Sequence, residues 1–393
     1  MTTVTTEAAP AWSNANFRRL WRGSAASTLG AEIGEIALPL LALLTLSATA
    51  AEVSVLRMAQ FLPFLVATLP VGLLVDRLRS ARLRMMIGAD VARGVLLGLI
   101  AVAAWSGVAT MPVLYAVVFA VAVGTVLFQV ADFALLPSVV TPEQLVDANG
   151  KLSATHSASE IAGRGVGGLL VQALSAPVAV LLNGLGYLVS AVSLARIRIG
   201  GPEPTPESGR RGSGWQEALA GVGLTLRHRY LRPLLGEATT FNLANEVFLL
   251  GLLLYAVREI GLSPAAIGAV FMAAGVGSFL GAWFGARMTG RYGYGRVLLV
   301  SLIVGNGAPL VVLLVPYVGA WALGLLCAVF LTMGVGIGLA NVHAVSLRQH
   351  AVPEEQRGRV NAAYRLISWG AIPVGAALGG FVATVAGPFA AMA

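Results

Sequence analysis

Charged residues are scarce in this sequence, and their scarcity excludes most classes of protein. Only 11% of its 393 residues are Asp, Glu, Lys or Arg, against roughly 25% in an average soluble domain. Hydrophobic residues make up 57% of the chain, and its mean hydropathy is +0.81. A soluble core of this length would need far more polar surface to cover it, which excludes soluble globular, fibrous and disordered proteins. The composition therefore predicts an integral membrane protein with many spans.

Cysteine and lysine are almost absent. The single cysteine, Cys327, excludes an internal disulfide and metal sites built on paired thiolates. The single lysine, Lys151, does not belong to a G-x-x-x-x-G-K-[ST] phosphate loop, so we do not expect ATP-driven transport by this chain alone. No H-E-x-x-H motif or nucleophile elbow occurs either, and we expect no enzyme activity, no metal and no cofactor.

Long apolar stretches define the predicted architecture, because a helix needs about 20 apolar residues to cross a bilayer. Each stretch is too long and too uniformly apolar for a barrel strand, so we predict an all-α membrane protein. Residues 1–16 contain no basic residue, and the first stretch is too long for a signal peptide and lacks a cleavage site, so we interpret it as a retained span. The eleven predicted spans are 23–46, 53–75, 84–105, 114–136, 152–173, 178–197, 234–256, 264–288, 296–316, 319–345 and 363–386.

Basic residues lie mainly on one side of these spans. Twenty-one of the 26 fall in the N-terminal arm and in alternate loops, whereas the opposite loops carry only Arg258. The basic residues do not form a single patch, so no nucleic-acid partner is expected. Because basic loops stay in the cytoplasm, this asymmetry predicts a cytoplasmic N-terminus.

The two halves of the sequence resemble each other at an offset of 211–214 residues. Glu35 matches Glu246 at 211, and Gly163 matches Gly375 at 212. Parallel repeats of this kind are one of the architectures of transporters. The repeat predicts a twelfth span near 390–409, so we expect the chain to be truncated or to be a natural variant without that helix.

The repeat divides the chain into two helical bundles joined by a polar linker rich in Gly and Pro. Within the linker, residues 215–232 form either an interfacial amphipathic helix or a solvated connector. The predicted organisation is a cytoplasmic arm (1–22), a six-helix bundle (23–198), a cytoplasmic linker (199–232) and a second bundle with five helices (233–393).

The loop after the second span carries a glycine, an acid and several arginines at close spacing. Gly72 permits close helix contact at the membrane edge, and Asp76 can meet a positive helix N-terminus. Arg77 and Arg82 can pair with acids on neighbouring helices, and we favour Asp132 as such a partner. We interpret this cluster as a latch that holds the cytoplasmic ends of helices together in one state of the protein.

This loop resembles the loop motif of the major facilitator superfamily, G-x-x-x-D-R-x-G-R-[RK]. Three stretches, "NFRRLW", "FALLPSVVTPEQLVDANG" and "RGRVNAAYRLISWGAIPVGAALGG", are similar to the bacterial branch that exports macrolides and enterobactin-type siderophores. The resemblance implies a multi-pass monomer in the bacterial inner membrane. It also implies two pseudo-symmetric bundles that rock about a site at the membrane midplane.

The fifth span contains a run of small residues, GRGVGG. Its Gly163, Gly167 and Gly168 resemble the antiporter motif G-P-x-x-G-G, and Arg164 replaces the proline of that motif. Small residues let helices pack closely and slide past each other. The alternative interpretation is a general small-residue interface.

Three glutamates lie inside predicted spans, where an ionisable group is costly and is by default a functional candidate. Glu32 and Glu35 are three residues apart and share one face of the first span, and Glu246 lies in the seventh. The resemblance places these two spans at the central cavity, so the three carboxyls are candidates for proton coupling. A static ion pair or a polar packing contact is the alternative.

Two acid–base pairs are predicted within single helices by their spacing of three or four residues. They are Asp90 with Arg93, and Glu160 with Arg164. Arg57, also inside a span, has no obvious partner in the sequence.

The predicted function is proton-coupled export of an amphipathic small molecule, with the substrate, protons and the lipid bilayer as partners. Gln129, Asn242 and Asn245 are candidates for substrate binding, with interhelical hydrogen bonds as the alternative role. An uncoupled facilitator or importer, and a truncated membrane protein without transport activity, remain as alternative functions.

Overall fold

The computed structural model describes residues 10–198 and 214–393, except for the side chains of a few helical residues, Asp76 among them. Every element in these two ranges is helical. The α-helices are α1 (Ala15–Leu40), α2 (Ala50–Val66), α3 (Thr68–Arg77), α4 (Arg82–Trp105), α5 (Met111–Val139), α6 (Leu145–Ala173), α7 (Ala176–Ala195), α8 (Gly214–Arg227), α9 (Leu231–Arg258), α10 (Pro264–Tyr292), α11 (Tyr294–Gly307), α12 (Ala322–Ala351), α13 (Glu354–Val385) and α14 (Pro388–Met392).

Nine helical segments of the described chain are long and apolar enough to cross a membrane. The second predicted span is divided into α2 and α3 at Ala67, because Pro70 has no N–H to donate to the carbonyl of Val66. The fifth predicted span lies within α6, which is long but carries polar and charged residues from Lys151 to Arg164. The all-helical membrane fold is confirmed, with two of its predicted spans interrupted or more polar than the other nine.

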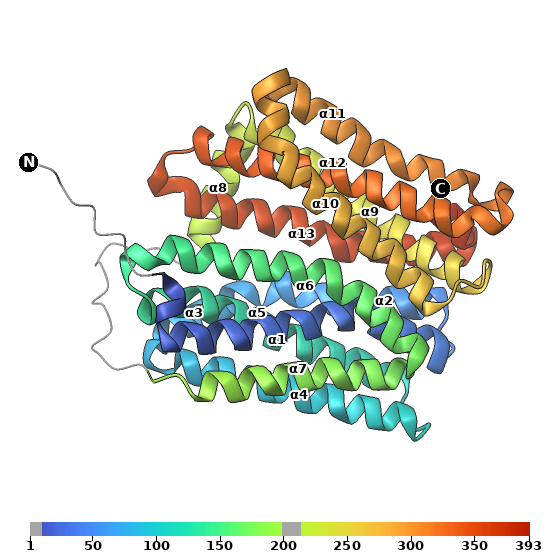
Figure 1. The fold of residues 1–393 in the computed structure, drawn as a ribbon, viewed down its shortest axis with the longest axis horizontal. Coiled ribbons are helices and arrows are strands. Elements are labelled where there is room, and N and C mark those ends of the chain that lie inside the picture. Colours follow the sequence, from blue (N-terminus) through green and yellow to red (C-terminus); the bar gives the residue numbers. More distant parts are fainter. Residues whose placement is uncertain (1–9, 199–213) are drawn as a thin grey trace, which may run out of the picture.

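The helices form two bundles in which the same pairs recur (Figure 1). In the first bundle, α1 packs against α6 and α7, and α4 packs against α5. In the second, α9 packs against α13 and α14, and α11 packs against α12. The bundles meet where α2 contacts α13 and where α6 contacts α10, and the sequence repeat relates these two contacts to each other.

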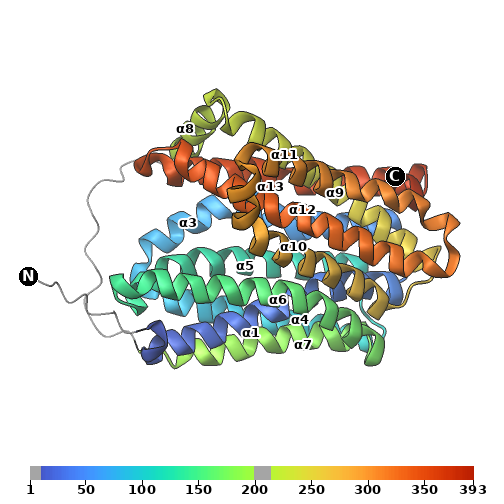
Figure 2. The ribbon, with the colours of Figure 1, turned by 45° about the horizontal axis from the view of Figure 1, so that its top comes forward.

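One end of the first bundle gathers the start of α1, the start of α6 and the end of α7. The Asn16 side chain donates to the Arg198 carbonyl at 2.8 Å, and the backbone N–H of Ala11 donates to Asp147 at 2.7 Å. We call this end, where the first described range stops at Arg198, the linker end, and the opposite end the far end. Figure 2 shows α8 at the linker end of the second bundle, where it packs against α13.

Candidate functional site

Arg57 of α2 joins two of the carboxylates predicted to couple protons. Its Nε and Nη2 donate to Oε1 and Oε2 of Glu246 at 2.7 and 3.2 Å. Its Nη1 donates to Oε1 of Glu35 at 2.6 Å and to Gln60 at 3.1 Å. Arg57 and Glu35 belong to the first bundle and Glu246 belongs to the second, so this ion-pair network connects the two bundles.

The network is largely shielded from solvent. The side chain of Glu246 is 5% exposed, that of Arg57 is 11% exposed and that of Glu35 is 29% exposed. Buried charges require partners, and the planar guanidinium meets both oxygens of Glu246 in a bidentate arrangement. One guanidinium faces two carboxylates, so the fully ionised network carries a net negative charge. Uptake of a single proton makes it neutral.

Arg164 forms a second network beside the first. Its Nε donates to Oε2 of Glu32 at 3.0 Å, and its Nη2 lies 3.5 Å from Oε1 of Glu160. The predicted pairing of Glu160 with Arg164 is therefore confirmed, and Glu32 of α1 shares the same arginine. Arg164 and Arg57 line one cavity of about 200 Å³ with residues of both bundles. The two networks thus meet at a single site between the bundles.

The run of small residues in α6 contacts a helix on each side. A methyl group at Gly163 would lie 2.5 Å from Cβ of Glu32, and one at Gly167 would lie 3.0 Å from the carbonyl oxygen of Ile33. On the opposite side, a methyl group at Gly168 would lie 2.8 Å from Cα of Gly268 in α10. The close packing expected of an antiporter-like motif is present, and it positions Arg164 beside α1.

The bundles are joined directly at the far end. Each of the joining hydrogen bonds uses a main-chain atom of one bundle and a side chain of the other. Separation of the bundles at this end must therefore break several specific contacts. The contacts are Ser54 Oγ to the Ala376 carbonyl at 2.7 Å, the Ala265 N–H to Gln172 Oε1 at 3.1 Å, and Arg258 to the Ala48 carbonyl.

A larger cavity, of about 670 Å³, lies nearer the linker end and is lined mostly by α1, α5 and α6. Gln129 and Asp132 line it, and so does Arg365 of the second bundle. The predicted pairing of Asp132 with Arg77 or Arg82 is wrong for this state. Asp132 lies seven residues, about 10 Å, inside the end of α5, too deep for the loop arginines. Its buried Oδ1 has no hydrogen-bond partner among the described residues.

Two residues of the loop motif, Gly72 and Arg77, can be placed in the described chain. A methyl group at Gly72 would meet open space within the described chain, so the expected close helix contact at Gly72 is absent. Arg77 is exposed at the end of α3. The side chain of Asp76 lies outside the described part of the chain, so its role in a latch stays a prediction.

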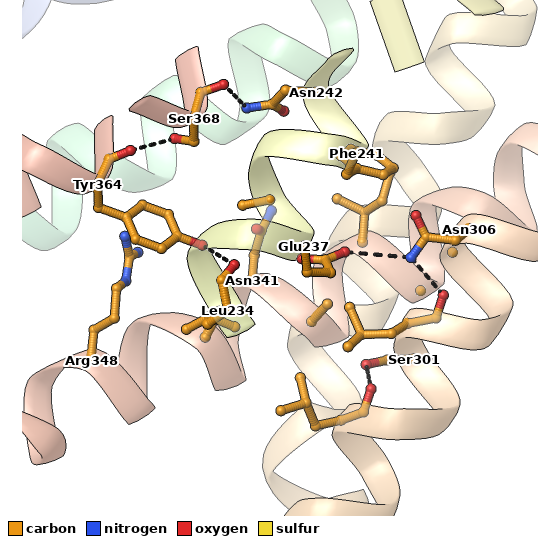
Figure 3. Close-up of a pocket in the computed structure, with 18 of the residues that line it drawn as sticks. Leu234, Glu237, Phe241, Asn242, Ser301, Asn306, Asn341, Arg348, Tyr364 and Ser368 are labelled. Atoms are coloured by element: carbon orange, nitrogen blue, oxygen red, sulfur yellow. Dashed lines mark hydrogen bonds between the residues drawn. The ribbon is translucent and has the colours of Figure 1, made fainter. Parts of the chain in front are cut away.

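The second bundle encloses a pocket of about 390 Å³ between α9, α11, α12 and α13 (Figure 3). The predicted substrate contact Asn242 lines this pocket and donates to the Ser368 carbonyl at 2.8 Å, the interhelical bond considered as its alternative role. Asn245 instead lines the cavity between the bundles, where its buried Oδ1 has no partner in the described chain. Two polar residues of the pocket inside the second bundle, Glu237 and Arg348, did not stand out in the sequence because they lie near helix ends.

The predicted pair of Asp90 and Arg93 is confirmed, and it is fully buried inside the first bundle. The guanidinium also lies 4.0 Å from the ring centroid of Tyr187 and 4.9 Å from that of Phe128. These contacts hold the pair between α4, α5 and α7, although Asp90 Oδ2 and Arg93 Nε are buried without a hydrogen-bond partner in the described chain. The pair therefore has a structural role within the bundle rather than a place at the cavities.

Comparisons with known proteins agree with this architecture. No curated protein matches the sequence. Solved structures with a similar fold include the nucleoside transporter NupG (TM-score 0.71, 11% identity, 94% of this chain and 90% of that one). A bacterial homologue of the iron transporter ferroportin in the inward-facing state gives a TM-score of 0.68 at 16% identity, covering 96% and 95%. A bacterial homologue of the human lysosomal transporter Spinster, inward-facing and unoccupied, gives 0.67 at 15% identity, covering 94% and 82%.

At these identities the structural matches establish the fold alone. A family model is more specific, and the model described as Major Facilitator Superfamily matches residues 20–391, nearly the whole chain. Two bundles with repeated helix pairs, and a charged site between them, fit that match. The chain belongs to the Major Facilitator Superfamily of membrane transporters.

Proposed function

We propose that this transporter couples the inward movement of protons to the export of amphipathic small molecules, such as antibiotics or siderophores. It acts as a monomer in the bacterial inner membrane, with the linker end in the cytoplasm. The basic loops at the linker end support that orientation. Membership of a transporter family argues against the alternative of a membrane protein without transport activity.

The observation that carries the proposal is the bridge from Arg57 to carboxylates of both bundles. Opening of the far end requires the contact between Arg57 and Glu246 to break, because its two partners lie in different bundles. Once separated from the guanidinium, the carboxylate of Glu246 can take up a proton from the outside. Closure brings Arg57 back against Glu246 and displaces that proton, which leaves through the cavity at the linker end.

This cycle links proton movement to the rocking of the two bundles about a midplane site. The driving force is sufficient for concentrative export. A proton-motive force of roughly 150 mV supplies about 3.5 kcal/mol per proton. At about 1.4 kcal/mol per tenfold change, one proton sustains a gradient of a few hundredfold in a neutral substrate.

Proton release from acidified inside-out vesicles tests the proposal. Hydrophobic antibiotics and siderophores are added one at a time, and the internal pH is followed with a fluorescent amine. We expect at least one compound to trigger proton release from vesicles that contain the wild-type chain. Glu259→Gln serves as the matched control, because Glu259 is an exposed glutamate just beyond α9.

Three outcomes separate the candidate functions. Triggered release that persists in Glu259→Gln and disappears in Glu246→Gln supports proton antiport through the network. Movement of a labelled compound without proton release identifies an uncoupled facilitator. Neither movement nor release for any compound contradicts the proposal.

A further inference from the structure

We infer that the pocket inside the second bundle binds the anionic group of an amphipathic organic monoanion, such as a carboxylate on a flat apolar body. The inference deepens the proposed function, and rests on it, in treating this ligand as a transport substrate. Binding itself requires only the pocket. The observation that points to this ligand is a pair of arginines, Arg348 and Arg365, that lie against aromatic rings and have no acidic partner among the described residues.

The pocket has the size and enclosure of a small-molecule site. Its volume of about 390 Å³ falls within the roughly 300–1,000 Å³ typical of such sites. Leu234, Leu298 and Ile337 contribute apolar walls, and Phe241 and Trp369 contribute aromatic ones. An apolar body of modest size is therefore accommodated.

Several polar groups of the pocket are already committed to the fold. The Tyr364 hydroxyl donates to the Leu234 carbonyl at 3.1 Å, and Ser368 Oγ donates to the Tyr364 carbonyl at 2.7 Å. The Asn242 amide donates to the Ser368 carbonyl. Figure 3 shows this chain of hydrogen bonds along the α9–α13 side of the pocket. These groups hold helices together and are not free to bind a ligand.

The lining groups that have no ion-pair or hydrogen-bond partner among the described residues include two arginines. Arg348 and Arg365 have no carboxylate within ion-pair distance in the described chain, and the Nε of Arg348 is buried without a hydrogen-bond partner. The exposed amide of Asn341 makes no hydrogen bond there either. A guanidinium inside a membrane protein is costly unless a partner compensates it. Its planar fork of N–H groups matches a carboxylate.

Aromatic rings hold both guanidinium groups in place. Arg348 lies 4.1 Å from the ring centroid of Tyr364, and Arg365 lies 4.6 Å from that of Trp369. Such contacts orient a cation without neutralising its charge. Glu237 faces the pocket from α9, where the Asn306 amide donates to it at 3.4 Å (Figure 3). With Arg348, Arg365 and Glu237 all ionised, the pocket carries one net positive charge, which fits a monoanion.

Arg365 connects the pocket to the rest of the molecule. It also lines the 670 Å³ cavity that lies mostly within the first bundle at the linker end. A ligand that enters that cavity therefore meets, at the boundary between the bundles, the guanidinium of Arg365, which has no ion-pair partner in the part of the chain that the structure describes. This position lets an anion pass from the cavity into the pocket.

Calorimetric titration of 2-naphthoate into the purified full chain in lipid nanodiscs tests the inference. We expect 2-naphthoate to bind and its neutral analogue 2-naphthamide to bind at least roughly tenfold more weakly, since a charge-assisted hydrogen bond is lost. Arg348→Gln should weaken naphthoate binding by a similar factor. The matched control is Arg296→Gln, because Arg296 is an exposed arginine at the start of α11 outside the pocket.

A second measurement keeps Arg348 in place and does not depend on how Arg348→Gln folds. Quenching of tryptophan fluorescence by 6-bromo-2-naphthoate should be smaller in Trp369→Phe than in the wild type. Equal binding of naphthoate and naphthamide, or no naphthoate binding to the wild type, would overturn the inference. Quenching that is the same in Trp369→Phe would place the ligand elsewhere and would also overturn it.

The inference and the proposed function fail in different ways. Naphthoate binding that depends on Arg348, with no compound able to trigger proton release in vesicles, would support the pocket and contradict the proposed function. Proton release driven by neutral or cationic compounds, unaffected by Arg348→Gln, would support the function and contradict the pocket assignment.

Discussion

Removal of the two carboxylates that contact Arg57 should destabilise the protein unequally. Glu246 is 5% exposed and accepts two hydrogen bonds from the guanidinium, whereas Glu35 is 29% exposed and accepts one. Breaking a buried pair by removing one partner costs about 3–5 kcal/mol. A single charge-assisted bond at a partly solvated carboxylate is worth about 1–2 kcal/mol. We therefore expect Glu246→Gln to lower the free energy of unfolding by more than Glu35→Gln.

The assay is reversible unfolding of the purified chain in mixed micelles, with Arg57→Gln included to complete two double-mutant cycles. The coupling energy between Arg57 and Glu246 should exceed that between Arg57 and Glu35. Glu259→Gln should stay within about 0.5 kcal/mol of the wild type, as an exposed residue outside the network does. Equal losses for the two network variants, or a larger coupling to Glu35, would refute the reasoning from burial and bond number.

Two further predictions concern the packing and the linker end. A methyl group at Gly168 overlaps the α10 backbone, so Gly168→Ala should push the two bundles apart at the far end. Spin labels at Ser106 of the first bundle and Tyr317 of the second, in a cysteine-free background, should then show a larger population of long distances. An unchanged distance distribution would contradict this. Hydrogen bonds from Lys151 and from the backbone N–H of Ala11 lower the pKa of Asp147 below its ordinary value. The stabilisation that these bonds give the folded linker end is therefore fully present above about pH 3.9. It should be lost as the pH falls through the lowered pKa, and the protection of the amides of residues 11–16 against exchange, relative to the intrinsic rate at each pH, should then fall. Asp147→Asn should show low protection of these amides at every pH.

The features that can be predicted from the sequence are those that depend on a single helix. Apolar stretches locate the spans, and a spacing of three residues is enough to predict the pair of Asp90 and Arg93. The partners of Arg57 could not be predicted in the same way, because Glu246 lies 189 residues away and approaches only through the packing of two bundles. The repeat did indicate that Glu35 and Glu246 occupy related positions, and the structure adds the arginine that joins them.

The predictions that failed concern how deep inside its helix bundle a charged side chain lies. Asp132 was expected to reach loop arginines, but it lies well inside α5 and faces a cavity. Arg348 follows the tenth predicted span, so the sequence places it in a loop; it lies near the end of α12, turns into the second bundle and stacks on Tyr364. Charge counts by loop do not distinguish arginines that face solvent from those whose side chains fold back into a pocket.

The measurement that tests the central claim most directly compares two modes of transport by Glu246→Gln in proteoliposomes. With any substrate that the wild type transports, one assay follows substrate movement driven by a proton gradient, and the other follows exchange of labelled for unlabelled substrate without a gradient. If the network couples protons, Glu246→Gln loses the gradient-driven movement and keeps the exchange, because glutamine resembles the protonated carboxyl. Retention of gradient-driven movement at the wild-type level would contradict the claim that protons act through Arg57 and its two carboxylates.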